Sequence, residues 1–374
     1  MQITTLRSVD DIASDEWDRL CEEPAFQHAW FRTVEQSGIV DLEPRHLVLR
    51  EEGRVAGILP CGIQRSDPYY TVHDRLFGRL SQPLSAIGLT MLPALVAASP
   101  LMHQSRIFVD ERVDRPRAIQ ALCQAMIDTC RRERLPICAW PFVPYDPAMD
   151  AALRGAGFWR AYLCPMAEWD NRFTSFEAYL QDMKRASKHR YRTARYELNA
   201  IAKDGIDLQD EPLDALTDEE LSALRARHYE RYHEHASPFS SAFFSSLRHE
   251  YGPRIHAFTA RRHGHLLAYA LAVQGADQWQ TLVGGESSYE DAHLHRLHFS
   301  LYYYFPIAQA IASGIRRIIY GLGAYEAKLQ RGCRLEPLYL YVYTGSPLLR
   351  LWLKPWMAML DAVHRRKHAR FASV

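Results

Sequence analysis

Apolar positions in the first half of the chain change from helical spacing to strand spacing and back again. Helical spacing predicts helices over 14–21 and 27–37, and a β-hairpin over 46–63 follows them. A further helix over 118–133 then precedes a buried strand over 137–142. The alternation of helices with strands predicts an α/β structure for this half.

The second half repeats this order of elements. Helices over 216–235 and 243–250 are followed by a second hairpin over 256–273 and by a strand over 279–283. No residue-level repeat accompanies the similarity. The order alone indicates two lobes built on one plan.

The stretch 297–332 reads as one helix, one strand and one loop. Apolar and aromatic residues predict a helix over 299–313, and Gly314 stands where a left-handed residue ends a helix. The short apolar strand 316–320 then runs directly into Gly321-Leu322-Gly323. A glycine turn after a strand presents backbone amides beyond the strand, so we expect a binding or catalytic site there.

Ionisable residues gather just after two predicted strands. Glu326 and Lys328 follow the glycine turn at 321–323, and Glu286 follows Gly284-Gly285. Because α/β proteins place their chemistry at strand ends, these side chains are candidate catalytic groups.

The same stretch resembles the C-terminal signature of the FemAB-like predicted N-acyltransferases, a branch of the GNAT superfamily. The matching residues are Leu297-His298-Phe299, Tyr302-Tyr303, Ala310-Ile311, Gly314, and the loop from Gly321 through Glu326 and Lys328 to Arg331-Gly332. Ser300 and Ala327 depart from the family pattern, in which an acidic residue and a histidine are expected.

The resemblance implies an α/β fold of two tandem GNAT-like lobes, each a twisted mixed β-sheet flanked by helices. The expected divisions are an N-terminal lobe over 1–165, a catalytic lobe over 166–345 and a helical basic tail over 346–374.

The resemblance also implies roles for the candidate residues. Lys328 would stand opposite the oxyanion of an acyl transfer, and the proton of the acceptor amine would go to Glu326, which the motif carries, or to Glu286 or His298. Three tyrosines are assigned to the acceptor pocket: Tyr302, Tyr303 and Tyr325.

A basic stretch over 184–195 is the steepest charge anomaly in the chain, whose net charge is only +1. Cations three and four residues apart on a helix form one positive stripe, so the stretch predicts contacts to donor phosphates, with a solvated helix face as the alternative. The residues assigned to these contacts are Lys184, Arg185, Lys188 and Arg192, together with Arg331 of the loop.

These observations predict an N-acyltransferase that acylates a small amine, an amino acid or a peptide-like acceptor. An acyl-CoA donor is favoured, and aminoacyl-tRNA is the alternative because a basic helix suits diphosphate and RNA backbone alike. Both donors are co-substrates, and no tightly bound cofactor is expected. A third possibility is a non-catalytic module that binds a cell-wall or peptide ligand.

The remaining features restrict location and partners. Seven scattered cysteines without a CxxC pair, and a start that lacks an apolar signal core, favour a reduced, cytoplasmic protein. His293, His295 and His298 are spaced like metal ligands, but no cysteine or carboxylate completes a familiar set, and no metal is expected. The aperiodic segment 64–83 is interpreted as a loop near the ligand.

The tail from Leu348 combines large apolar residues with the basic run Arg365-Arg366-Lys367. Two interpretations fit this composition, a packed terminal helix and a helix lying on a membrane surface. The packed helix is preferred, so peripheral membrane contact is the less favoured expectation.

Overall fold

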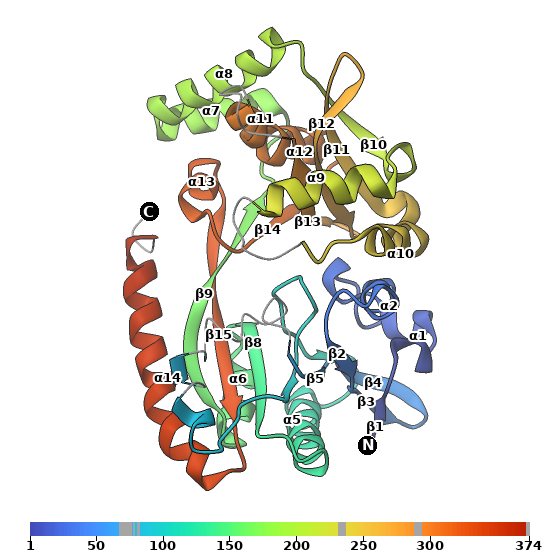
Figure 1. The fold of residues 1–374 in the computed structure, drawn as a ribbon, viewed down its shortest axis with the longest axis vertical. Helices are drawn as coiled ribbons and strands as arrows, with labels where there is room; N and C mark the ends of the chain where they lie inside the picture. The colour runs from blue at the N-terminus through green and yellow to red at the C-terminus, as the bar shows by residue number, and fades with distance from the viewer. Residues whose placement is uncertain (67–76, 78, 81–82, 231–236, 288–293, 372–374) are drawn as a thin grey trace. The chain divides into compact units, whose positions relative to one another are not determined.

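The structure of the chain is a computed structural model that describes residues 1–66, 77, 79–80, 83–230, 237–287 and 294–371 (Figure 1). Its contacts divide the chain into two units, Met1–Met166 with Glu336–Val374, and Ala167–Leu335. The chain passes from one unit to the other within β9 (Trp159–Asp170) and again within β15 (Arg334–Tyr343). The C-terminal segment is therefore grouped with the N-terminal lobe.

The described strands of the first unit form two groups. The first is antiparallel, in the order β1 (Gln2–Leu6), β3 (His46–Glu51), β4 (Arg54–Leu59) and β7 (Phe108–Val109). The second follows the order β15, β8 (Ile137–Pro144), β6 (Ala94–Val96), β5 (Gly62–Gln64) and β2 (Leu42–Pro44). Only the β6–β8 pair of this second group is parallel among the described pairings.

Helices cover these strands through their apolar faces. They are α1 (Ser14–Asp18), α2 (His28–Ser37), α5 (Arg115–Arg132), α6 (Pro147–Gly155) and α14 (Pro347–His368), with short 3₁₀ turns at Val9–Asp11 and Pro24–Phe26. Asp114 caps α5 by accepting from the Arg117 N–H. Residues one helical turn apart in α5, such as Ile119, Leu122 and Met126, are completely buried in the core of the unit. All seven cysteines of the chain are free thiols.

The second unit is built on one mixed sheet. Its strand order is β10 (Asp207–Pro212), β11 (Ile255–Arg262), β12 (His265–Gln274), β13 (Gln278–Glu286), β14 (Arg317–Gly321) and the end of β9. The β13–β14 pair is parallel and the other pairs are antiparallel. Since parallel neighbours need a crossover, the chain between β13 and β14 carries helices.

Helices pack on both faces of this sheet (Figure 1). They are α7 (Phe176–Ala186), α8 (Lys188–Lys203), α9 (Asp218–Glu230), α10 (Ser241–Tyr251), α11 (Leu294–Phe299), a π-turn (Ser300–Tyr304), α12 (Phe305–Ala312) and α13 (Tyr325–Gln330). On β12, Ala268, Ala270 and Ala272 join the core beneath α7, α8 and the crossover helices. Tyr269 points to the other face, where its hydroxyl donates to the Leu221 carbonyl of α9 (2.9 Å).

The structure confirms both hairpins and the left-handed Gly314 (φ +69°), and it places the basic stretch 184–195 on two consecutive helices, α7 and α8. Ser175 caps α7, since its side chain accepts from the Ala178 N–H. The predicted helix over 299–313 is interrupted by the π-turn, where the Phe305 N–H donates to the Ser300 carbonyl.

Other elements were not predicted. The loop after the glycine turn contains the short helix α13, and the strands β10 and β15 carry charged or bulky residues that obscure their period. Most of the expected ligand loop over 64–83 lies outside the described residues.

Gly285 permits a close approach between β13 and the backbone of helix α9. A Cβ at this position would lie 2.7 Å from backbone atoms of Leu224 and Arg225 in α9. We expect Gly285→Ala to lower the free energy of unfolding by about 1–3 kcal/mol, because the helix backbone must move away from the strand. Chemical denaturation measures the change.

Gly155→Ala is the matched control, because a Cβ at the last residue of α6 meets open space. Its stability should stay unchanged or rise by up to about 1 kcal/mol. Equal losses in the two variants would contradict the tight contact between α9 and β13.

Candidate functional site

Glu286, the last residue of β13, carries a carboxylate that is almost completely buried, with 3% of the side chain exposed. The two glycines before it allow this position. A Cβ at Gly284 would lie 2.1 Å from the Tyr302 hydroxyl, and Gly285 contacts the α9 backbone. Elements on both faces of the sheet therefore close around the strand end and enclose the Glu286 side chain.

His298 of α11 makes the main contact with this carboxylate. Its Nδ1 lies 2.6 Å from Glu286 Oε1. Since an ionised carboxylate only accepts hydrogen bonds, Nδ1 carries the proton and Nε2 of a neutral ring keeps its lone pair. About a quarter of the His298 side chain is exposed (24%), and no described residue bonds Nε2. The pair can therefore accept a proton at an accessible nitrogen.

Tyr302 fixes the plane of this imidazole. The two rings are stacked with centroids 4.5 Å apart and an interplanar angle of 21°. The Tyr302 hydroxyl donates to the Tyr269 carbonyl of β12 (3.2 Å). Tyr302 lies within the π-turn that begins two residues after His298, and π-turns inside helices are frequent at functional sites.

Helix α9 approaches the same carboxylate from the opposite layer. His228 Nδ1 lies 3.9 Å from Glu286 Oε2, and Oε2 accepts no hydrogen bond from the described residues. Arg225 of the same helix donates to the Gly284 carbonyl (3.2 Å). An imidazole thus flanks each side of Glu286, which adds positive charge whenever either ring is protonated.

Lys328, the predicted oxyanion partner, is buried inside the glycine turn, with 4% exposed. Its Nζ donates to the carbonyls of Tyr320, Gly321 and Leu322, at 2.8, 3.0 and 2.9 Å. The turn therefore directs carbonyls toward its centre, where the amides had been expected to point outward. All three ammonium protons are used by the fold, so none is left for a substrate oxyanion in this conformation.

Burial lowers the pKa of Lys328 to about 8. The three carbonyls act in the other direction, because they bind the ammonium more strongly than the neutral amine.

Arg331 was assigned to the donor phosphates, but it lies in the core with 3% exposed. Its Nη2 bonds both carboxylate oxygens of Glu197 in α8, at 3.2 and 3.0 Å, and Nη1 donates to the Ala327 carbonyl. The guanidinium also lies over the Phe299 ring, 3.9 Å from its centroid. These contacts place Arg331 within the fold and not at a phosphate-binding surface.

The other loop candidates take different environments. Glu326 is exposed on the first turn of α13, and Tyr325, which begins that helix, is half-buried. Tyr303 is in the core, where its ring packs against Tyr320 (5.0 Å) and burial raises its pKa to about 12. Of the predicted catalytic and acceptor residues, the described contacts thus bring together Glu286, His298 and Tyr302.

The predicted basic stripe is exposed on the surface formed by the end of α7 and the start of α8. Its exposed cations are Lys184, Arg185, Lys188, Arg192 and Arg195. Asp182 pairs with Arg185 at 3.3 Å, but this ion pair is solvent-exposed and contributes little stability. The stripe remains available to a polyanionic ligand.

A cavity of about 260 Å³ lies beside this stripe, between α7, the end of β9 and the start of β15. Aromatic rings of Trp169, Phe173 and Tyr179 form one wall, and Arg190 lies on another. The register pairs Asp170 with Arg317 and Arg317 with Gln278, so the cavity lies where β13 and β14 begin. Glu286 ends β13 eight residues later, about 25 Å away along an extended strand.

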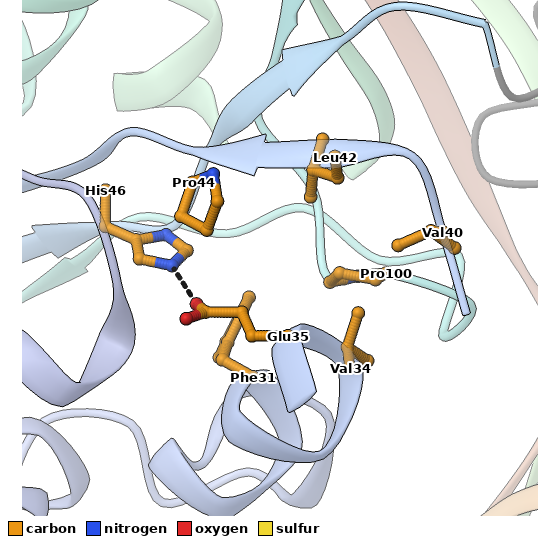
Figure 2. A pocket seen from close by; sticks show the side chains of 8 residues that line it. All are labelled: Phe31, Val34, Glu35, Val40, Leu42, Pro44, His46 and Pro100. Carbon is orange, nitrogen blue, oxygen red and sulfur yellow. Dashed lines mark hydrogen bonds and ion pairs between the residues drawn. The ribbon is translucent and has the colours of Figure 1, made fainter. Parts of the chain in front are cut away.

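A second Glu–His pair, which had no signal in the sequence, lies in the first unit and joins the buried His46 to the partly exposed Glu35. Figure 2 shows Glu35 of α2 pointing at His46 of β3, with Oε1 and Nε2 3.2 Å apart. The Cys61 N–H donates to His46 Nδ1 (3.2 Å), and Glu35 also accepts from the Val9 N–H and the Ser8 hydroxyl. The adjoining cavity is only about 30 Å³, room for one water molecule. The hydrogen bonds of the pair join four segments of the chain.

No group of three His, Cys, Asp or Glu side chains suited to a metal ion occurs among the residues that the structure describes. His293 and the His295 side chain, which suggested a metal set together with His298, lie outside the described residues.

Comparison with known proteins adds a family match. The FemAB-like family model, described as peptidoglycan biosynthesis/recognition, matches residues 8–371. No curated protein matches the sequence.

Solved structures share the fold at low sequence identity. FemX is 14% identical over 94% of this chain and 99% of its own, with a TM-score of 0.61. The C-terminal domain of a putative lysylphosphatidylglycerol synthetase from Agrobacterium fabrum is 14% identical over 94% and 96%, with a TM-score of 0.56. A tandem GNAT protein from the clavulanic acid pathway is 13% identical over 92% and 99%, with a TM-score of 0.51. These similarities confirm the expected tandem GNAT-like α/β fold.

Burial of the Lys328 ammonium should make the free energy of unfolding depend on this residue and on pH. Lys328→Met leaves three turn carbonyls without their donor, and we expect it to lower the free energy of unfolding by about 2–4 kcal/mol at pH 7. Between pH 8 and about 10.5 the unfolded lysine binds a proton that the folded one has lost, so wild-type stability rises with pH in that window.

The advantage of the wild type over Lys328→Met should therefore grow by about 2 kcal/mol from pH 7 to pH 9.5. Denaturant unfolding of both proteins at the two pH values measures it. A constant difference would show instead that the three carbonyls hold the lysine protonated throughout.

Proposed function

The chain belongs to the FemAB-like family of peptidoglycan biosynthesis and recognition, and on this premise we propose that it transfers an acyl or aminoacyl group from an activated carrier to an amine of a peptide-like acceptor. The observation that carries the proposal is the buried Glu286 carboxylate bonded to a partly exposed His298. The fold shared with FemX and with a tandem GNAT protein supports it.

The reaction joins the acceptor nitrogen to the carbonyl carbon of a thioester or ester. As the C–N bond forms, the amine loses a proton, and the C–S or C–O bond to the carrier then breaks. His298 Nε2 is the group that takes the proton, because this nitrogen keeps its lone pair and is accessible. The proton can then pass to the departing thiolate or alkoxide.

Glu286 supports this step without touching the substrate. Its hydrogen bond to Nδ1 holds the histidine in the tautomer whose lone pair lies on Nε2. Its negative charge also stabilises the imidazolium that forms when Nε2 takes the proton. Tyr302, stacked on the ring, keeps the imidazole in one orientation. Because Glu326 is exposed and makes no such contact, the Glu286–His298 pair is the better-supported proton acceptor.

The donor is a carrier that bears phosphate groups. The exposed cations of α7 and α8, from Lys184 to Arg195, support a polyanionic carrier, which includes both acyl-CoA and aminoacyl-tRNA. The sequence favoured acyl-CoA, and the peptidoglycan description of the family adds weight to a charged tRNA.

We predict that His298→Ala and Glu286→Gln each lower kcat by about 10²- to 10⁴-fold, the usual range for losing a general base or its orienting partner. The assay follows a product amide by mass spectrometry with an amine-bearing peptidoglycan stem peptide as acceptor. His265→Ala is the control, because His265 is an exposed residue at the start of β12. If both site variants retain the control's rate, the Glu286–His298 pair is not the proton acceptor.

Ionic strength separates the donors. The same assay is run with acyl-CoA thioesters and with charged tRNA at rising salt concentrations. Transfer from tRNA should weaken steeply with salt, since many phosphate contacts release counterions, whereas transfer from CoA should change much less. If neither donor is consumed by the wild type, the chain is a binding module and the transfer proposal fails.

A further inference from the structure

Helix α14 carries an exposed apolar stripe on the side turned away from the protein. Its large exposed side chains follow helical spacing, and their exposed fractions are Leu348 59%, Leu351 71%, Trp352 49%, Met359 45% and Val363 53%. Pro355, Ala358 and Ala362 are also exposed between them. One helix therefore carries five of the nine large hydrophobic residues that are exposed in the described chain.

The opposite face of the same helix is already packed. Leu349, Leu353, Met357 and Leu360 are buried, with at most 6% exposed. A surface helix anchored in this way normally presents polar residues to solvent. Apolar residues on both faces indicate that the outer one is covered by something other than the described chain.

The charges on α14 indicate what kind of surface covers the stripe. Six cations lie on α14 or just after it, and all six are exposed: Arg350, Lys354, Arg365, Arg366, Lys367 and Arg370. Arg366 and Arg370 continue the line of the apolar stripe, because they follow Trp352, Met359 and Val363 at multiples of a helical turn.

The helix carries a single carboxylate, Asp361, which is turned toward the protein. It accepts from the Tyr162 N–H of β9 (2.7 Å) and pairs with Arg365 (2.7 Å). The stripe therefore offers no acid that could pair with the cations of a second copy of this chain.

We propose that α14 lies on an anionic lipid surface, with the stripe of Leu348, Leu351, Trp352, Met359 and Val363 at the level of the acyl chains. Exposed cations at the end of the stripe would contact lipid phosphates, and Trp352 suits the boundary between head groups and acyl chains. The helix lies on the surface and does not cross it, since no helix of the described chain is long and apolar enough to cross a membrane. This inference does not depend on the transfer reaction.

The sequence preferred a packed terminal helix to a membrane-surface helix. The structure shows that packing uses one face only and leaves a second apolar face exposed. The two interpretations of the tail are therefore compatible, and the surface contact is the one that explains the exposed residues.

Co-sedimentation of the full chain with vesicles tests the proposal. We use phosphatidylcholine vesicles and vesicles in which about a third of the lipid is phosphatidylglycerol. The chain should bind the anionic vesicles at least tenfold better, and binding should weaken at high salt. Absence of binding to the anionic vesicles, or equal binding to both, would overturn the proposal.

Two variants locate the contact. Leu351→Glu places a charge in the stripe, and the double variant Arg366→Glu/Lys367→Glu reverses its basic end; each should reduce vesicle binding at least tenfold. All of these residues are exposed, so the core that holds α14 stays intact, and circular dichroism verifies folding.

Gln120→Glu is the control, because it adds the same charge as Leu351→Glu at an exposed position of α5. It should bind like the wild type. Normal binding by Leu351→Glu would overturn the proposal.

Light scattering of the wild type and of Leu351→Glu tests the alternative that a second copy of the chain covers the stripe. A wild-type dimer that Leu351→Glu converts to a monomer would assign the stripe to a second copy of the chain and overturn the lipid assignment.

Discussion

A carboxylate without access to water must be hydrogen-bonded, and in the second unit this requirement falls on Glu286. Its main partner, His298, reaches it only because Gly284 and Gly285 leave space for Tyr302 on one side and for α9 on the other. The glycines, the stacked tyrosine and the histidine are therefore parts of one arrangement. Together they hold the imidazole in one tautomer with an accessible nitrogen, and proton removal from an amine requires such a group.

The two buried cations of the motif loop have a different task. Lys328 and Arg331 satisfy backbone carbonyls, and Arg331 also pairs with Glu197 in α8. A buried charge is tolerated when it is paired and hydrogen-bonded, and these contacts hold the loop that follows β14 in one shape. Residues that mark a family in sequence can thus act on the backbone of a loop, while the accessible imidazole nitrogen belongs to His298 of α11.

In helix α14, too, the residue types alone do not show which side chains are buried. Its apolar residues were evident from the sequence, but the sequence did not show which of them are buried and which face outward. Only the packing of Leu349, Leu353 and Met357 against the protein shows which residues remain outside. The exposed face then combines with the cations of the last turns into one surface.

The sequence by itself determined the α/β class, the two-lobed plan, both hairpins, the basic stretch and the family, because hydrophobic period, turn glycines and a dense local motif are all properties of neighbouring residues. It also identified Glu286 and His298 as candidates. It did not determine that they bond each other, because their distance depends on how β13 and α11 pack. It also did not determine that Lys328 turns inward, because that depends on how α13 folds back over the glycine turn. Period and spacing describe one element at a time, whereas burial and hydrogen-bond partners are decided only when the elements come together.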